Sequence, residues 1–343
     1  MNNKILVSIL IVNFIIRLFF LFSSDFLVGD DGERYLVEGK NLYEYGVFSN
    51  EKSTNPNPTA HDLPAYPFLI YSLLKLSVDI EFIPLALGII NLLFLNIIIY
   101  IIYLITKNFT KNKYIPIIST IIFSLHPNIF IYTNFHMPDI IFTCLILSTV
   151  LYYLRWLKSE NKMHLIMVFL FWGISVLLKP ISMFFGIIIF TISLLIKSSY
   201  KIVILSFLTG CLTLLPWSLR NKQEFNSYSL SSISGNNLFN FNYRFLLEYQ
   251  NENNLNEKLN EKEVLKNLNA EDLNNPMKVS ELLFSHAFSK ITTNFKDYFF
   301  MSVCRHSKMY LRTSSISFFI MTGDKLSVEK LKIFNNNINF NNF

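Results

Sequence analysis

The sequence has few cysteines, and none of them forms an obvious pair. Cys144, Cys211 and Cys304 are the only three, and they lie far apart in apolar or mixed segments. That spacing fits neither a metal knuckle nor a disulfide framework. The formal net charge is +6, but no concentrated basic surface is visible, so nucleic acid is not an expected partner. No internal repeat is visible, whereas many secondary transporters have one.

Apolar sequence is what the chain has in abundance. Of its 343 residues, 52% are hydrophobic, and the mean hydropathy is +0.37. A helix needs about 20 apolar residues to cross the hydrocarbon layer. We therefore expect an all-α polytopic membrane protein with about seven transmembrane helices, at 5–22, 82–105, 114–134, 140–154, 164–179, 181–196 and 202–217.

The placement of lysine and arginine predicts the orientation. Basic residues collect in every second connection: Lys4, then Lys107, Lys111 and Lys113, then Arg155, Lys158 and Lys162, then Lys197 and Lys201. The first intervening loop, 23–81, is rich in Asp and Glu instead. Cytoplasmic loops carry the excess of Lys and Arg. The sequence thus predicts a multi-pass membrane protein, with the acidic loop on the outer face of a bacterial-type inner membrane or in an equivalent lumen.

Composition divides the chain into three regions. Residues 1–217 form the predicted transmembrane body, and 218–285 are polar and expected on the outer face. Residues 286–343 mix aromatic and basic residues before a tail rich in Asn, which predicts an interfacial helical segment and a disordered end. The run at 66–78 is too short to span and is expected to lie on the membrane surface.

Acidic residues mark the outer ends of two predicted spans. Asp30, Asp31 and Glu33 follow the first span in the stretch GDDGERY, and Asp139 lies in HMPD before the fourth. One interpretation is helix capping: Asp30 or Asp31 for a helix that starts near Glu33, and Asp139 for one that starts near Ile140. The other is catalysis, because a base placed there can meet a membrane-borne substrate. The two interpretations are compatible.

Two cations are expected at the same face. Lys179 precedes Pro180 at the end of the fifth predicted span, and Arg220 follows the seventh in PWSLRN. Either can bind a phosphate, lysine as a compact charge and arginine as a planar fork. Snorkelling to lipid headgroups is the alternative for each.

Three histidines, His61, His126 and His136, also fall near the predicted outer face. No pair has the i, i+4 spacing of ligands on one helix. The sequence therefore assigns no metal ligands. A divalent metal is kept as a cofactor hypothesis.

Several motifs together resemble a known family. They are D-x-x-x-Y from Asp31 to Tyr35, PAYP at 64–67, HPNIFIYTNFHMPDIIF, GISVLLKPISM and LPWSLRNKQEF. In this order they resemble the polyprenyl-phosphate-sugar-dependent glycosyltransferases of the C type (GT-C), which include protein O-mannosyltransferases and the aminoarabinose transferase of lipid A. The resemblance covers about residues 5–240.

The resemblance implies a mechanism and a set of site residues. Asp31 corresponds to the family's first-loop base, with Asp30 as the near alternative, and Asp139 to its second acidic position. Glycine follows Asp31 where many relatives have Glu, so Glu33 or Asp30 is expected to substitute for that carboxylate. The expected substrate-binding residues are Glu33, Tyr35, Tyr66, Lys179, Arg220 and His61.

The implied partners are a polyprenyl-phosphate-linked sugar donor, a lipid, glycan or protein acceptor, and membrane lipids. Transfer would be one direct displacement with inversion at the sugar carbon. Two other functions remain open: a transporter or flippase for lipids or small molecules, and a non-catalytic membrane protein of envelope assembly. Transporters place ionisable residues near the bilayer midplane, whereas the acids here lie at the span ends, which favours the enzyme.

Overall fold

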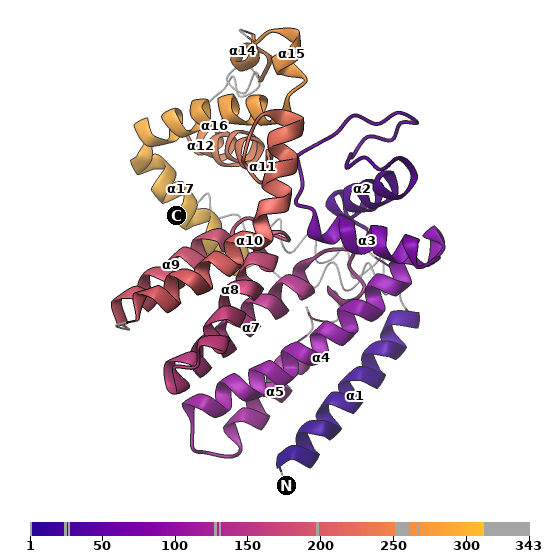
Figure 1. Cartoon of the computed structure of the whole chain (residues 1–343), viewed down its shortest axis with the longest axis vertical. Helices are drawn as coiled ribbons and strands as arrows, with labels where there is room; N and C mark the ends of the chain where they lie inside the picture. The colour runs from indigo at the N-terminus through magenta and orange to yellow at the C-terminus, as the bar shows by residue number, and fades with distance from the viewer. Residues whose placement is uncertain are drawn as a thin grey trace. The chain divides into compact units, whose positions relative to one another are not determined.

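The computed structural model describes residues 2–23, 26, 28–126, 129, 132–196, 199–250, 261–266 and 268–311. Over these ranges the chain is helical and contains no β-strand, as the all-α prediction requires (Figure 1). The chain forms two compact units. The N-terminal unit contains the described residues up to 56 and 64–216, and the C-terminal unit contains 57–63 and the described residues of 217–313.

The N-terminal unit is a helical bundle built around α4. This helix packs against α1, α5 and α7, while α7 packs against α8 and α8 against α9 (Figure 1). The helices are α1 (Asn2–Ser23), α2 (Asp30–Tyr45), α3 (Ala65–Lys75), the short 3-10 helix η1 (Ile80–Phe82), α4 (Ile83–Phe109), α5 (Ile115–Ser124), α7 (Asp139–Ser159), α8 (Lys162–Val176), α9 (Ser182–Ile196) and α10 (Tyr200–Phe225), whose last residues belong to the C-terminal unit.

Four segments are long and apolar enough to cross a membrane: Lys4–Ser23, Ile80–Phe109, Asp139–Ser159 and Tyr200–Phe225. They match four of the predicted spans, and the protein is accordingly an integral membrane protein. The other three predicted spans correspond to the shorter apolar helices α5, α8 and α9. The last of the four continues to Phe225, beyond residue 217 where that span was predicted to end.

The prediction of one unbroken helix over 114–134 is wrong, because α5 ends at Ser124 and Leu125 and His126 are not helical, although Ile129, Tyr132 and Thr133 are helical. Arg17 of α1, fully buried, satisfies the carbonyl at this helix end: its Nη2 donates to the Ser124 carbonyl oxygen over 2.6 Å, and its Nε donates to Asn13 Oδ1 over 2.9 Å. Asn13 Nδ2 also donates to the Ser124 carbonyl. A carbonyl at a helix end needs such donors when no water is present.

Small residues bring α8, α9 and α10 close together. A Cβ atom on Gly173 would lie 2.6 Å from the Gly210 carbonyl oxygen, and one on Gly186 would lie 2.0 Å from the Trp172 ring. Trp172 Nε1 donates to the Ser182 carbonyl over 2.8 Å, so its polar edge is satisfied inside the bundle. Close packing at glycines is how apolar helices associate in lipid, where the hydrophobic effect between helices is weak.

The C-terminal unit has its own core, formed by Phe239, Tyr243, Leu246, Leu247, Leu283, Ala287, Ile291 and Met301. Its longest helix begins with Pro276 at the first position, and the Asn275 side chain accepts hydrogen bonds from two backbone N–H groups of the first turn. The helices are α11 (Ile233–Asn237), the π-helix η2 (Leu238–Tyr243), α12 (Arg244–Tyr249), α14 (Glu261–Leu265), α15 (Ala270–Leu273), α16 (Pro276–Thr293) and α17 (Phe295–Leu311).

Helices were predicted at 66–78 and within 286–322, and the structure has them as α3 and as the described parts of α16 and α17. Their predicted position at the membrane interface stays a prediction. Residues 251–260 of the polar stretch and the tail from 312 onward lie outside the described residues.

Candidate active site

The acidic cluster forms the first turn of α2. Helix α2 begins at Asp30 with Gly29 at the N-cap, and no side chain caps it. The capping interpretation of Asp30 and Asp31 is therefore wrong, although acids in a first turn still complement the helix dipole. The Asp31 side chain is 51% exposed and its Oδ1 lies 2.9 Å from Arg34 Nη2. Such an i, i+3 pair contributes only about 0.2–0.5 kcal/mol, so this carboxylate stays available to other groups.

Gly32 explains why α2 can lie close to the segment before α7. A Cβ atom at residue 32 would be 2.7 Å from the His136 carbonyl oxygen and 3.1 Å from the His136 Cβ. No larger side chain fits there without a shift of the backbone. Gly32 departs from the family pattern. It lets the acidic turn pack against His136, which precedes Asp139 by three residues in the sequence.

The loop after α2 folds back along this helix. Asn41, buried, donates from Nδ2 to the carbonyl oxygens of Ser49 and Glu51, over 2.7 and 2.9 Å. Farther along, Lys52 Nζ pairs with Glu33 Oε1. The predicted role of Glu33 in place of a second site carboxylate stays a prediction, since this carboxylate holds the returning loop in the structure.

Asp139 and Lys179 form an ion pair. Lys179 Nζ donates to Asp139 Oδ1 over 2.7 Å, and the two side chains are 29% and 30% exposed. Asp139 is the first residue of α7. The N-cap of this helix is Pro138, and no side-chain hydrogen bond caps the helix. The capping interpretation of Asp139 is thus wrong as well. A partly exposed pair contributes at most about 1 kcal/mol, so an incoming anion can compete for Lys179.

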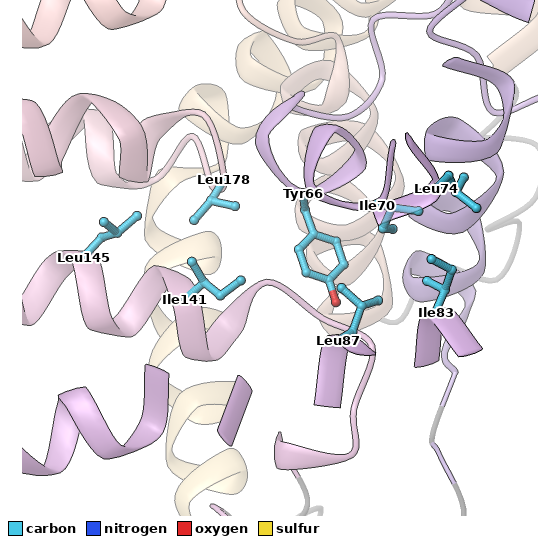
Figure 2. Packing of buried hydrophobic residues seen from close by; sticks show 8 residues of the cluster. All are labelled: Tyr66, Ile70, Leu74, Ile83, Leu87, Ile141, Leu145 and Leu178. Atoms are coloured by element: carbon cyan, nitrogen blue, oxygen red, sulfur yellow. The ribbon is translucent and has the colours of Figure 1, made fainter. Parts of the chain in front are cut away.

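A hydrophobic cluster underlies this pair. Tyr66 of α3 lies at its centre, 1% exposed, with its hydroxyl directed toward Leu87 (Figure 2). Leu178 and Ile141, next to the ion pair in sequence, pack in the same cluster. The cluster consists of Tyr66, Ile70, Leu74, Ile83, Leu87, Ile141, Leu145 and Leu178. The Ala65 N–H also donates to the Leu177 carbonyl, which fixes α3 against the end of α8.

Tyr35 and Tyr66 are in contact. Their ring centroids are 5.3 Å apart with the planes at 75°, an edge-to-face geometry. Burial raises the pKa of Tyr66, and the nearby charges of Tyr35 and Asp139 add to the shift. The Tyr66 phenol therefore keeps its proton at neutral pH and can act only as a neutral hydrogen-bonding group. Its predicted role in substrate binding stays a prediction.

Two predicted site residues belong to the other unit. His61 donates its backbone N–H to Thr59 Oγ1 over 3.2 Å. Arg220 donates from Nη1 to the Thr59 carbonyl over 2.8 Å and lies 4.9 and 5.0 Å from the ring centres of Trp217 and Phe225. These contacts tie the segment 57–63 to the end of α10. Binding of phosphate by Arg220 and of substrate by His61 remain predictions.

Sequence reasoning missed two cations in this region, Arg34 and Lys52, which pair with Asp31 and Glu33. The i, i+3 spacing of Asp31 and Arg34 was a usable signal, but the Lys52 contact spans 19 residues and depends on the fold of the loop. No group of three or more potential metal-ligating residues occurs among the residues that the structure describes.

We expect His136 to make stability depend on pH. The side chain is 2% exposed, and burial lowers its pKa to about 4, with the Pro84 carbonyl opposing part of the shift. In the unfolded chain a histidine binds its proton near pH 6.5. As pH falls from about 6.5 to 4 the unfolded state therefore gains protons first, and the free energy of unfolding decreases by roughly 3 kcal/mol.

The measurement is thermal unfolding of the purified protein between pH 4 and 7. His136→Gln should flatten the dependence over this window, whereas His306→Gln, at an exposed position, should leave it as in the wild type. Equal pH slopes for the wild type and His136→Gln would contradict the assignment.

These observations define a helical integral membrane protein in which the N-terminal unit carries carboxylates of α2 and α7 and a lysine that follows α8. Residues 61–218 match the family model of the dolichyl-phosphate-mannose-protein mannosyltransferases. The match confirms the resemblance predicted from the motifs and supports a membrane glycosyltransferase of the GT-C type. It includes Asp139 and Lys179 but not Asp31 or Arg220. No curated protein matches the chain.

Proposed function

We propose that the protein transfers a sugar from a polyprenyl-phosphate donor to an acceptor hydroxyl or amine at the outer membrane face. The observation that carries the proposal is the packing of the acidic turn of α2, through Gly32, on the segment that leads to the Asp139 and Lys179 ion pair. The family match supports the same donor class, because its description names a dolichyl-phosphate sugar.

The chemistry needs a base and a positive charge. In the proposed reaction, Asp31 accepts the proton of the acceptor group as this group forms its bond to the anomeric carbon. The bond from that carbon to the phosphate oxygen breaks on the opposite side, so the configuration inverts. The leaving phosphate takes the electron pair and gains negative charge, which Lys179 stabilises. Asp139 holds Lys179 in place until the phosphate arrives.

The proposed orientation puts this site on the outer face. At the other end of the N-terminal unit, Leu6, Tyr103 and Ile117 pack together, which places the start of α1, the end of α4 and the start of α5 at one level. Lys158 Nζ donates to Asn108 Oδ1 over 2.9 Å, which adds the end of α7. This end carries the basic loops, and the positive-inside bias makes it cytoplasmic.

We include α5, α8 and α9 among the membrane-crossing elements, which makes seven. Helices α8 and α9 have 15 residues each, about 22 Å at 1.5 Å per residue, so each falls short of the roughly 30 Å layer. Helix α5 has 10 residues, about 15 Å, which is about half of the layer.

The test uses the purified full chain in vesicles with a crude acceptor fraction from bacterial envelopes. Two labelled donors are compared, a polyprenyl-phosphate sugar and the corresponding nucleotide sugar. We expect label to reach the acceptor only from the lipid-linked donor, with release of polyprenyl phosphate. Transfer from the nucleotide sugar alone would overturn the donor class, and movement of lipid across the vesicle without transfer would favour the transporter.

A further inference from the structure

An open groove runs between α1 and α5, at the opposite end of the N-terminal unit from the acidic turn. Its volume is about 430 Å³, and its walls are mostly apolar. Ile9, Ile16 and Ile121 form part of the lining, Lys4 lies at one end, and Asn13 and Ser124 lie at the other. None of the reactions above uses it.

The groove ends where α5 ends. The hydrogen bonds of Arg17 and Asn13 to the Ser124 carbonyl close it with a polar floor. From Lys4 to Ile16 the groove follows α1 for twelve residues, about 18 Å at the helical rise of 1.5 Å per residue. This length is close to half of the roughly 30 Å hydrocarbon layer. The groove therefore has the depth of one leaflet.

Charge defines the open end. Lys4 lies at the level where α4 ends and α5 begins, because Leu6 packs with Tyr103 and Ile117. The last turn of α4 adds Lys107, and the connection between α4 and α5 adds Lys111 and Lys113. An apolar channel with a cluster of cations at its mouth matches a ligand with a hydrocarbon chain and an anionic head.

We propose that this groove holds one acyl chain of an anionic phospholipid of the cytoplasmic leaflet, with the headgroup at Lys4. The proposal rests on the orientation argued above and not on the transfer reaction. The sugar donor is not the occupant, because its phosphate has to reach Lys179 at the other end of the bundle. The bound phospholipid fills the space that α5 leaves between itself and α1, and it stabilises the contact of the two helices.

The experiment measures lipid retention by the full-length protein. The protein is extracted from vesicles that contain equal amounts of phosphatidylglycerol and phosphatidylcholine, and the lipids that remain bound in detergent are identified by native mass spectrometry. We expect the wild type to keep phosphatidylglycerol in preference. Lys4→Gln should lower this preference about fivefold, the effect of one lysine near a membrane surface. Ser8→Phe, which fills the groove, should abolish retention of both lipids.

Matched controls separate the groove from general effects. Lys75→Gln removes the same charge from an exposed position at the end of α3, outside the cation cluster at the groove mouth, and Val7→Phe adds the same bulk to an exposed position of α1 outside the groove lining. Both should retain lipid as the wild type does. No retained lipid in the wild type, an unchanged preference in Lys4→Gln, or equal retention by Ser8→Phe and Val7→Phe would each overturn the proposal. Transfer activity is not a readout, so a failure of the proposed reaction gives a different result.

Discussion

Asp31→Asn should lower sugar transfer by about 10²–10⁴-fold, the range that a positioned general base contributes. The amide has nearly the same size as the carboxylate, but it cannot accept the acceptor's proton. The loss should appear in kcat, because the base acts in the transition state rather than in substrate binding. The measurement is the initial rate of transfer from a labelled polyprenyl-phosphate sugar by protein in vesicles.

Three controls accompany this variant. Asp30→Asn and Glu33→Gln remove the neighbouring carboxylates of the same turn and should reduce the rate less than Asp31→Asn does. Arg34→Gln removes the ion-pair partner of Asp31 and should change the rate only a few fold, because that exposed pair is weak. If Asp30→Asn causes the large loss and Asp31→Asn a small one, the base is Asp30. If all four variants transfer sugar at the wild-type rate, the acidic turn has no part in the mechanism.

The helical class and four spans could be predicted because they depend on local composition. Long apolar runs with few charges specify α1, α4, α7 and α10 directly. The end of α5 at Ser124 has a local signal that the predicted span of 114–134 ignored, because His126, Pro127 and Asn128 interrupt the apolar run and the residue before a proline disfavours the helix. The partner of the Ser124 carbonyl could not be predicted, because Arg17 lies more than 100 residues earlier in the sequence.

The candidate site shows the same division. Asp31, Asp139 and Lys179 could be selected from the sequence, since each is a charged residue at the end of a predicted span and each belongs to a recognisable motif. Their partners could not, because the Lys179 contact with Asp139 spans 40 residues. The role of Gly32 was invisible for a related reason: a glycine in a polar turn gives no sign that the His136 backbone lies against it.

Lys179→Met should lower kcat/KM for the lipid-linked donor by about 10²–10³-fold, the loss typical when one group that stabilises a developing negative charge is removed. Methionine keeps an unbranched apolar side chain and loses the ammonium, whose Nζ lies 5.8 Å from the centre of the Phe142 ring. Lys179→Arg should keep most of the activity, because a guanidinium supplies the same charge to the phosphate. The KM for the acceptor should not change. The measurement is steady-state transfer at varied donor concentrations.

Asp139 tests whether the ion pair works as a unit. If Asp139 only holds Lys179, the double variant Asp139→Asn with Lys179→Met should be no slower than Lys179→Met alone, since residues that act together are not additive. A further loss in the double variant would give Asp139 its own catalytic role. Lys52→Met removes another cation, one that pairs with Glu33, and should leave donor kcat/KM near the wild-type value. An equal loss in Lys52→Met and Lys179→Met would mean that donor use depends on general positive charge, and Lys179 would lose its assigned place beside the leaving phosphate.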